Sequence, residues 1–229
     1  VRTAIYHNIE CYGIRRGYNG LINGDVVKLD EKNVSHIINR GGTILYTARS
    51  KEFMTEEGQK RAVSTCKFLG LDSIIAIGGG SAIDTSKAIA IIINNPEFAD
   101  VRSLEGVAPT KNKAVPTFAV PTTAGTAAEV TINYVITDEE NRKKMVCVDP
   151  NDIPVCAVID CELMMSMPKG LTAATGMDAL THAIESFITP GAWTMSDMFE
   201  FKAIELIATH LKNAVENGKD EVARSGMAE

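Results

Sequence analysis

Short apolar runs alternate with longer segments of helical periodicity along the first two thirds of the chain. The runs are rich in Val, Ile and Thr and are bounded by Gly, Pro or Asp, which is the pattern of buried strands. They predict strands at residues 10–14, 43–46, 73–77, 117–120 and 155–159. Helices are predicted between them at residues 34–39, 56–68 and 81–93. This alternation indicates an α/β fold, a parallel sheet with flanking helices.

The pattern changes toward the end of the chain. Residues 132–137 and 144–148 alternate around a polar turn and predict a hairpin. After Pro168 the helical period predicts helices at 170–187 and 195–217, and residues 220–229 begin another. We expect this helical part to be truncated, with exposed apolar faces that favour aggregation or oligomerisation, as a homodimer or a higher oligomer.

A glycine cluster follows the predicted strand at 73–77. Gly78, Gly79, Gly80 and Ser81 lead directly into the predicted helix at 81–93. Glycines allow the backbone to approach a ligand closely, and a helix N-terminus favours negative charge, so the segment is a candidate phosphate cradle. The spacing is not that of the G-x-G-x-x-G fingerprint, and a tight turn alone is the alternative interpretation.

Small hydroxylated residues follow the predicted strand at 117–120. The segment 121–131, PTTAGTAAEVT, offers backbone N–H groups and threonine hydroxyls to an anion or a ribose.

One predicted helix carries an acid and an imidazole one turn apart. Asp178 and His182 stand at positions i and i+4, so their side chains share a face and can hold a divalent metal ion together. The alternative is a core histidine with satisfied hydrogen bonds beside an unrelated surface acid.

Three segments in order, GGGSAIDTSKAIA (78–90), PTTAGTAAEVT (121–131) and GMDALTHAIE (176–185), resemble iron-containing (group III) alcohol dehydrogenases. The resemblance runs from about residue 72 to the end of the chain, and it is strongest to the propanediol oxidoreductase (lactaldehyde reductase) branch. It implies an NAD-dependent oxidoreductase with a Rossmann-like dinucleotide-binding segment at 73–165 and a helical metal-binding domain at 166–229. It also implies cofactor contacts: Gly79, Gly80 and Ser81 with the pyrophosphate, Thr122, Thr123 and Thr131 with the nicotinamide half, and Lys144 with the ribose.

The same resemblance makes Asp178 and His182 two of four metal ligands, for Fe²⁺ or, as the alternative ion, Zn²⁺. The family carries the other two, both histidines, in a later helical segment that this chain does not contain. The expected reaction interconverts a small, lactaldehyde-like aldehyde and its alcohol or diol. A two-ligand site leaves the ion mostly coordinated by water, so we expect little turnover from this chain alone.

Residues 1–71 resemble a different family, bacterial ATP-dependent 6-phosphofructokinase. The resemblance rests on GYNGL (17–21), INRGGTILYTAR (38–49) and EEGQK (56–60). It implies that Arg49 faces ATP and that Arg2 matches an effector-site arginine. Gly78–Ser81 lacks the kinase's metal-binding aspartate, so phosphoryl transfer is not expected.

These two resemblances lead to the hypothesis of a chimera that joins a kinase-like segment at 1–72 to a dehydrogenase segment. Two alternatives to dehydrogenase activity stay open at this point. One is a 6-phosphofructokinase fragment, and the other is an inactive chimera that only binds nucleotides.

The composition of the chain argues against two classes of binding partner. A net charge of −6 argues against nucleic acid, and a mean hydropathy near zero with no long apolar stretch argues against a membrane span. Five cysteines without C-x-x-C spacing, and no signal peptide, indicate reduced thiols and a cytoplasmic location.

Overall fold

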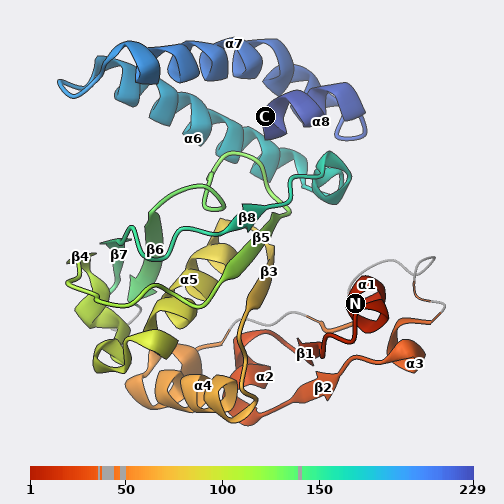
Figure 1. Ribbon diagram of the computed structural model, residues 1–229. Helices are drawn as coiled ribbons and strands as arrows, with labels where there is room; N and C mark the ends of the chain where they lie inside the picture. Colours follow the sequence, from red (N-terminus) through yellow and green to blue (C-terminus); the bar gives the residue numbers. More distant parts are fainter. Residues whose placement is uncertain (36, 38–43, 47–49, 139–140) are drawn as a thin grey trace.

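A three-stranded parallel sheet lies at the centre of the computed structural model, which describes all residues except 36, 38–43, 47–49 and 139–140 (Figure 1). Its strands, in spatial order, are β3 (Ile74–Gly78), β5 (Thr117–Pro121) and β8 (Cys156–Ala157). Helix α5 (Gly80–Asn94) covers one face of the sheet, where its Ile83 packs against alanines of β3 and β5. The predicted α/β fold, a parallel sheet with flanking helices, is confirmed.

The other side of α5 packs against a second sheet. Strands β6 (Asn133–Asp138) and β7 (Lys143–Val148) form the predicted hairpin, and β4 (Gly106–Val107) pairs with β7 in parallel. Ile91, Tyr134 and Met145 are almost completely buried between helix and hairpin. This second core fixes the hairpin against the helix that follows the glycine cluster.

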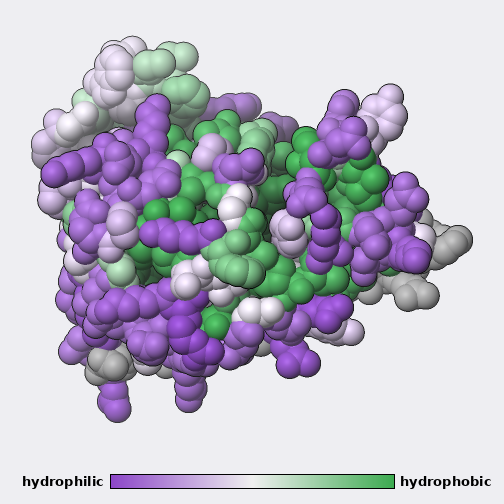
Figure 2. Space-filling view, turned by 60° about the horizontal axis from the view of Figure 1, so that its bottom comes forward, coloured by the Kyte–Doolittle hydropathy of each residue, from purple (hydrophilic) through white to green (hydrophobic). Residues whose placement is uncertain are grey.

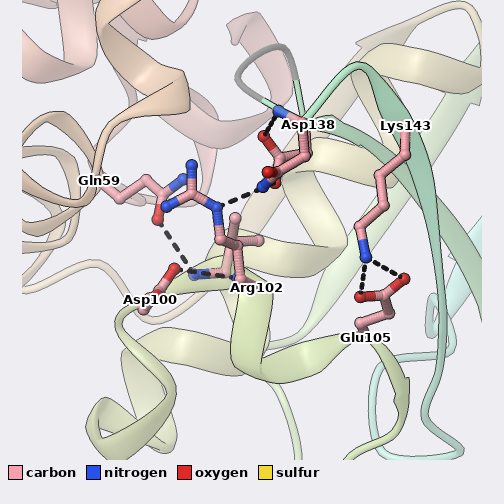
Figure 3. A network of polar contacts seen from close by, with 8 residues as sticks. Gln59, Asp100, Arg102, Glu105, Asp138 and Lys143 are labelled. Atoms are coloured by element: carbon pink, nitrogen blue, oxygen red, sulfur yellow. Dashed lines mark hydrogen bonds and ion pairs between the residues drawn. The ribbon is translucent and has the colours of Figure 1, made fainter.

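Polar contacts join the hairpin to the segment before it (Figure 3). Arg102 Nε donates to Asp138 Oδ2 at 3.0 Å, and the Arg102 guanidinium holds the pKa of that carboxyl well below its ordinary value. Lys143 Nζ donates to both carboxylate oxygens of Glu105 at 2.9 and 2.7 Å. The amide of Val101 donates to Gln59 Oε1 at 3.1 Å, which ties the N-terminal part of the chain to the same corner.

The N-terminal part forms a layer of small elements below the sheet in Figure 1. They are α1 (Arg2–Tyr6), β1 (Tyr12–Ile14), α2 (Tyr18–Asn23), β2 (Val26–Lys28), α3 (Glu31–Val34) and α4 (Glu56–Phe68). Strands β1 and β2 pair with each other, antiparallel and apart from the parallel sheet. Leu21, Phe53 and Ala62 pack with Ile89 of α5, so this layer shares a core with the segment that follows it.

Two predicted elements of this layer are wrong within the described residues. No strand forms at 44–46, because Ile44 and Leu45 lie in a turn and Tyr46 takes a left-handed φ of +61° that an extended strand does not allow. The helix predicted at 34–39 instead ends at Val34, since Ser35 is extended. Its start is set by Asp30, whose carboxylate caps the amide of Asn33 at 3.0 Å. The remainder of both predictions lies outside the described residues.

Three helices complete the chain and lie beyond the carboxyl ends of the parallel strands (Figure 1). They are α6 (Lys169–Ile188), α7 (Thr194–Glu216) and α8 (Glu221–Ala228), close to the predicted ranges. Helices α6 and α7 lie side by side, and α8 packs on α7. Short 3₁₀ turns occupy the connections: η1 (Glu52–Met54), η2 (Pro96–Phe98), η3 (Val101–Leu104) and η4 (Cys161–Met164).

Many large apolar side chains face solvent. Ile75 and Ile77 of β3 point away from α5 and are 64% and 66% exposed, while Met198 and Phe199 of α7 are 68% and 69% exposed. Figure 2 shows apolar side chains gathered on the face it presents. Among the described residues, no helix combines the length and hydropathy required to cross a membrane.

Candidate active site

The glycine cluster forms a tight turn between β3 and α5. Gly79 is the N-cap of α5, and its carbonyl oxygen accepts hydrogen bonds from the amides of Ala82 and Ile83 at 2.9 and 3.2 Å. Among the described residues, no side chain caps this helix start. The N–H groups of Gly80 and Ser81 are therefore available to an anionic ligand.

The loop after β5 closes over this turn. A Cβ atom on Gly80 would lie 2.7 Å from Thr126 Oγ1, and one on Gly79 would lie 3.2 Å from Thr123 Cγ2. The amide of Thr122 donates to the carbonyl of Gly78 at 2.8 Å, which holds the loop against the turn. A Cβ at Gly80 would therefore force Thr126 to move, and one at Gly79 would be tighter than an ordinary contact, so glycine is favoured at both positions.

One threonine hydroxyl of the loop has no partner. Thr123 Oγ1 is buried and makes no hydrogen bond within the described part of the chain. A buried hydroxyl without a partner costs about 1–3 kcal/mol, so a hydroxyl left in this state beside a glycine cradle fits a ligand that bonds to it. Residues 79–80, 122–123 and 126 are thus brought together as a cradle.

The same loop also reaches the helical part. Gly125 has φ +125°, and a Cβ there would lie 2.3 Å from the carbonyl oxygen of Thr175 in α6. The loop therefore contacts α6 at Thr175, about one helical turn before Asp178. The cradle and the metal-ligand candidates therefore belong to neighbouring surfaces.

Asp178 and His182 do share one face of α6, as predicted. Nε2 of His182 lies 3.8 Å from Oδ2 of Asp178, and the two side chains are 70% and 56% exposed. Among the residues that the structure describes, no group of three His, Cys, Asp or Glu side chains could hold a metal ion. The pair offers two donors of suitable chemistry and does not enclose an ion by itself.

The remaining predicted site residues are distributed as follows. Thr131 lies at the end of the loop, where Lys87 of α5 donates to its carbonyl oxygen at 2.5 Å. Ser81 is exposed in the first turn of α5. Lys144 is exposed on β7 opposite Thr137, and no hydrogen bond within the described chain joins it to the cradle. Arg49 lies outside the described residues.

Several residues at this site were missed from the sequence. Thr126 approaches the glycine turn, Lys87 donates to the end of the loop and Asp84 accepts from Val135 of β6. None of the three was assigned a role from the sequence, although all lie inside the segments 78–90 and 121–131. A signal for two of them was present, because Asp84 and Lys87 interrupt an otherwise apolar helix that must be buried on both sides.

Comparison with known families gives two matches. The model of the family described as "Iron-containing alcohol dehydrogenase" matches residues 29–161, and that described as "Fe-containing alcohol dehydrogenase family, C-terminal" matches residues 172–229. The chain belongs to the iron-containing alcohol dehydrogenase family. The glycine cradle lies inside the first match, and Asp178 and His182 lie inside the second.

Individual proteins with similar sequences are also alcohol dehydrogenases or aldehyde reductases by name. Lactaldehyde reductase of Escherichia coli (strain K12) is 66% identical over 151 residues, which cover 66% of this chain and 40% of that protein. NAD-dependent methanol dehydrogenase of Bacillus methanolicus is 44% identical over 157 residues, 69% of this chain and 41% of that protein. The chain thus spans about two fifths of the length of these relatives.

Solved structures give the same fold. An alcohol dehydrogenase from Oenococcus oeni aligns with a TM-score of 0.70 and 41% identity, covering 76% of this chain and 45% of that one. Sulfoacetaldehyde reductase from Bifidobacterium kashiwanohense, solved in complex with NAD⁺, aligns with a TM-score of 0.69 and 34% identity, covering 80% and 48%.

The comparisons also bear on the N-terminal part. The dehydrogenase family match begins at residue 29, so it includes residues that the sequence analysis assigned to a kinase-like segment. The phosphofructokinase resemblance and the chimera hypothesis receive no support from these comparisons. The boundary at residue 72 stays a prediction.

Proposed function

We propose that this chain carries the dinucleotide-binding part and two metal ligands of an NAD-dependent oxidoreductase that interconverts a small, lactaldehyde-like aldehyde and its alcohol or diol. The observation that carries the proposal is the cradle: two glycines closed over by Thr123 and Thr126 at the uncapped start of α5. Membership of the iron-containing alcohol dehydrogenase family supports it.

The pyrophosphate of NAD would lie against the first turn of α5. The backbone N–H groups there and the positive end of the helix dipole favour a phosphate, and the absence of Cβ atoms on Gly79 and Gly80 lets it approach. Thr122 and Thr123 would then line the path toward the nicotinamide, which gives the unpartnered Thr123 hydroxyl a hydrogen-bond partner. We assign Ser81 to the pyrophosphate, Thr131 to the nicotinamide half and Lys144 to the ribose on the family resemblance.

Asp178 and His182 would supply two ligands to a divalent metal ion, Fe²⁺ with Zn²⁺ as the alternative. When bound, such an ion acts as a Lewis acid on the oxygen of the alcohol or aldehyde while hydride passes to or from the nicotinamide. With two exposed donors and no third within the described residues, affinity should be far below that of a complete site. We therefore expect slow turnover or none from this chain by itself.

The choice of substrate rests on the relatives. Lactaldehyde reductase is the relative with the highest identity given above, and the methanol dehydrogenase also has a small alcohol in its name. Nothing in the described residues favours 6-phosphofructokinase activity.

We also propose that the chain associates with itself and that it functions in the cytoplasm. Exposed Ile75, Ile77 and Phe199 offer apolar surface that a second copy could cover. All five cysteines are free thiols, which suits a reducing compartment.

Titration with NADH, followed by nicotinamide fluorescence, tests the binding proposal directly. We expect saturable binding that ADP-ribose displaces. An NADH oxidation assay with lactaldehyde and Fe²⁺, beside an assay of ADP formation with fructose 6-phosphate, tests the reaction class. Any NADH oxidation should disappear in Asp178→Ala, whereas fructose 6-phosphate-dependent ADP formation without NADH binding would contradict the proposal.

A further inference from the structure

Two charged side chains of α5 point into the protein toward the end of the loop after β5. Asp84 and Lys87 stand three positions apart, on one face of the helix. Lys87 has no exposed surface, and Asp84 is partly buried. Such residues are rarely buried unless they are paired or hydrogen-bonded, so their partners indicate what they do.

Those partners are the backbone of residues 131–135. Nζ of Lys87 donates to the carbonyl oxygens of Thr131 at 2.5 Å and Asn133 at 3.0 Å, and lies 3.3 Å from Thr131 Oγ1. Oδ2 of Asp84 accepts from the amide of Val135 at 3.1 Å. The Lys87 ammonium donates to backbone carbonyls and the Asp84 carboxylate accepts from a backbone amide. Together the two side chains therefore bind both the acceptors and a donor of this backbone segment.

Burying the charge of Lys87 costs free energy, and a side chain that served only to pack the core would not need that charge. Burial lowers the pKa of Lys87, and the carboxylates of Asp152, Asp84 and Glu129 oppose that change. An apolar side chain of similar volume would avoid the burial of a charge. The Lys87 ammonium, unlike an apolar side chain, donates hydrogen bonds to the carbonyls of Thr131 and Asn133 and so fixes their positions.

We propose that Asp84 and Lys87 form a loop clamp: they are positioning residues that hold Thr131 at a set distance from the glycine turn before the dinucleotide binds. The inference rests on the proposed dinucleotide function. Helix α5 begins at the pyrophosphate cradle, and Lys87 lies seven residues beyond Gly80, or about 10 Å along a rigid helix. One helix therefore fixes both the pyrophosphate end and the nicotinamide end of the site.

The test compares two ligands on Lys87→Met. NADH reaches both ends of the site, whereas ADP-ribose lacks the nicotinamide and uses the pyrophosphate end. We expect the variant to bind NADH about tenfold more weakly and to bind ADP-ribose within about twofold of the unaltered chain. Thr85→Val is the matched control, since it removes a buried hydroxyl of the same helix that donates to the carbonyl of Ser81 rather than to residues 131–135. It should leave the ratio of the two affinities unchanged.

Equal losses for both ligands in Lys87→Met would overturn the clamp and leave Lys87 a purely structural residue. Hydrogen exchange on the unaltered chain gives a second measurement that needs no variant. The amide of Val135, which donates to Asp84, should exchange more slowly than the amides of 123–127 in the absence of any dinucleotide. Equally fast exchange of the Val135 amide and that segment would refute the clamp, even if Lys87→Met does not fold or NADH does not bind.

Discussion

Asp152 is the buried carboxyl whose environment gives the sharpest stability prediction. Its side chain is 1% exposed, and neither carboxylate oxygen has a hydrogen-bond partner within the described residues. Burial raises its pKa from an ordinary 3.8 to about 7, against the opposing charge of Lys87. We therefore expect Asp152→Asn to become stabilising, relative to the unaltered chain, as the pH rises.

The sign and size follow from the two pKa values. Between about pH 4 and pH 7 the folded chain keeps a proton on Asp152 that the unfolded chain releases, so stability falls as the pH rises through this window. Asparagine does not titrate, and its variant escapes this loss. From pH 5 to pH 8 the difference amounts to about 2–3 kcal/mol, at about 1.4 kcal/mol for each pH unit over which the proton is fully retained in the folded chain. Above about pH 8 it should stay constant.

Urea unfolding followed by circular dichroism at pH 5 and pH 8 measures this difference. The free energy of unfolding of Asp152→Asn, minus that of the unaltered chain, should be about 2–3 kcal/mol larger at pH 8 than at pH 5. Asp149→Asn is the control, because the Asp149 carboxylate accepts hydrogen bonds from the Thr110 hydroxyl and the Asn151 amide and should show no such gain. A pH-independent difference for Asp152→Asn would refute the reasoning.

Three further variants test the packing, each by urea unfolding. Gly176→Ala should cost about 1–3 kcal/mol, because its new Cβ would lie 2.3 Å from Leu211 Cδ1 where α6 and α7 meet; no loss would mean that the helices are not so closely packed. Arg224→Met should cost about 3 kcal/mol, because the buried guanidinium donates to the Thr172 hydroxyl and two backbone carbonyls; a neutral effect would contradict these bonds. Arg102→Leu should destabilise the chain at neutral pH and reduce the loss of stability below about pH 4, since Arg102 lowers the pKa of Asp138; an unchanged acid profile would count against this pair.

Local signals in the sequence were sufficient for much of the fold. The strand at 73–77, the glycine turn and the helix at 81–93 were predicted because apolar runs, glycine and helical periodicity all act within about fifteen residues. The pair Asp178 and His182 needed only the helical repeat. In contrast, the strand predicted at 43–46 was wrong over its described residues, 44–46. Tyr46 is left-handed there, and the carbonyl of Leu45 accepts from the amide of Arg16 at 2.7 Å, a contact that an apolar run does not reveal.

The rest of the site depends on contacts between segments distant in sequence. The approach of Gly125 to Thr175 joins residues fifty positions apart, and Lys87 reaches Thr131 across forty-four. Sequence patterns within one helix or loop cannot specify such pairs. Only the unusual charges of Asp84 and Lys87 on a largely buried helix indicated that polar partners were required.

The central claim is that the glycine turn at the start of α5 receives the pyrophosphate of NAD. Titration of Gly80→Ala with NADH tests it most directly, because the new Cβ would lie 2.7 Å from Thr126 Oγ1, inside the cradle. The matched control is Gly170→Ala, where a Cβ meets nothing within 4 Å. We predict that Gly80→Ala binds NADH at least about tenfold more weakly while Gly170→Ala binds it unchanged. Equal affinity in both variants would show that the dinucleotide, if it binds, does not occupy this turn.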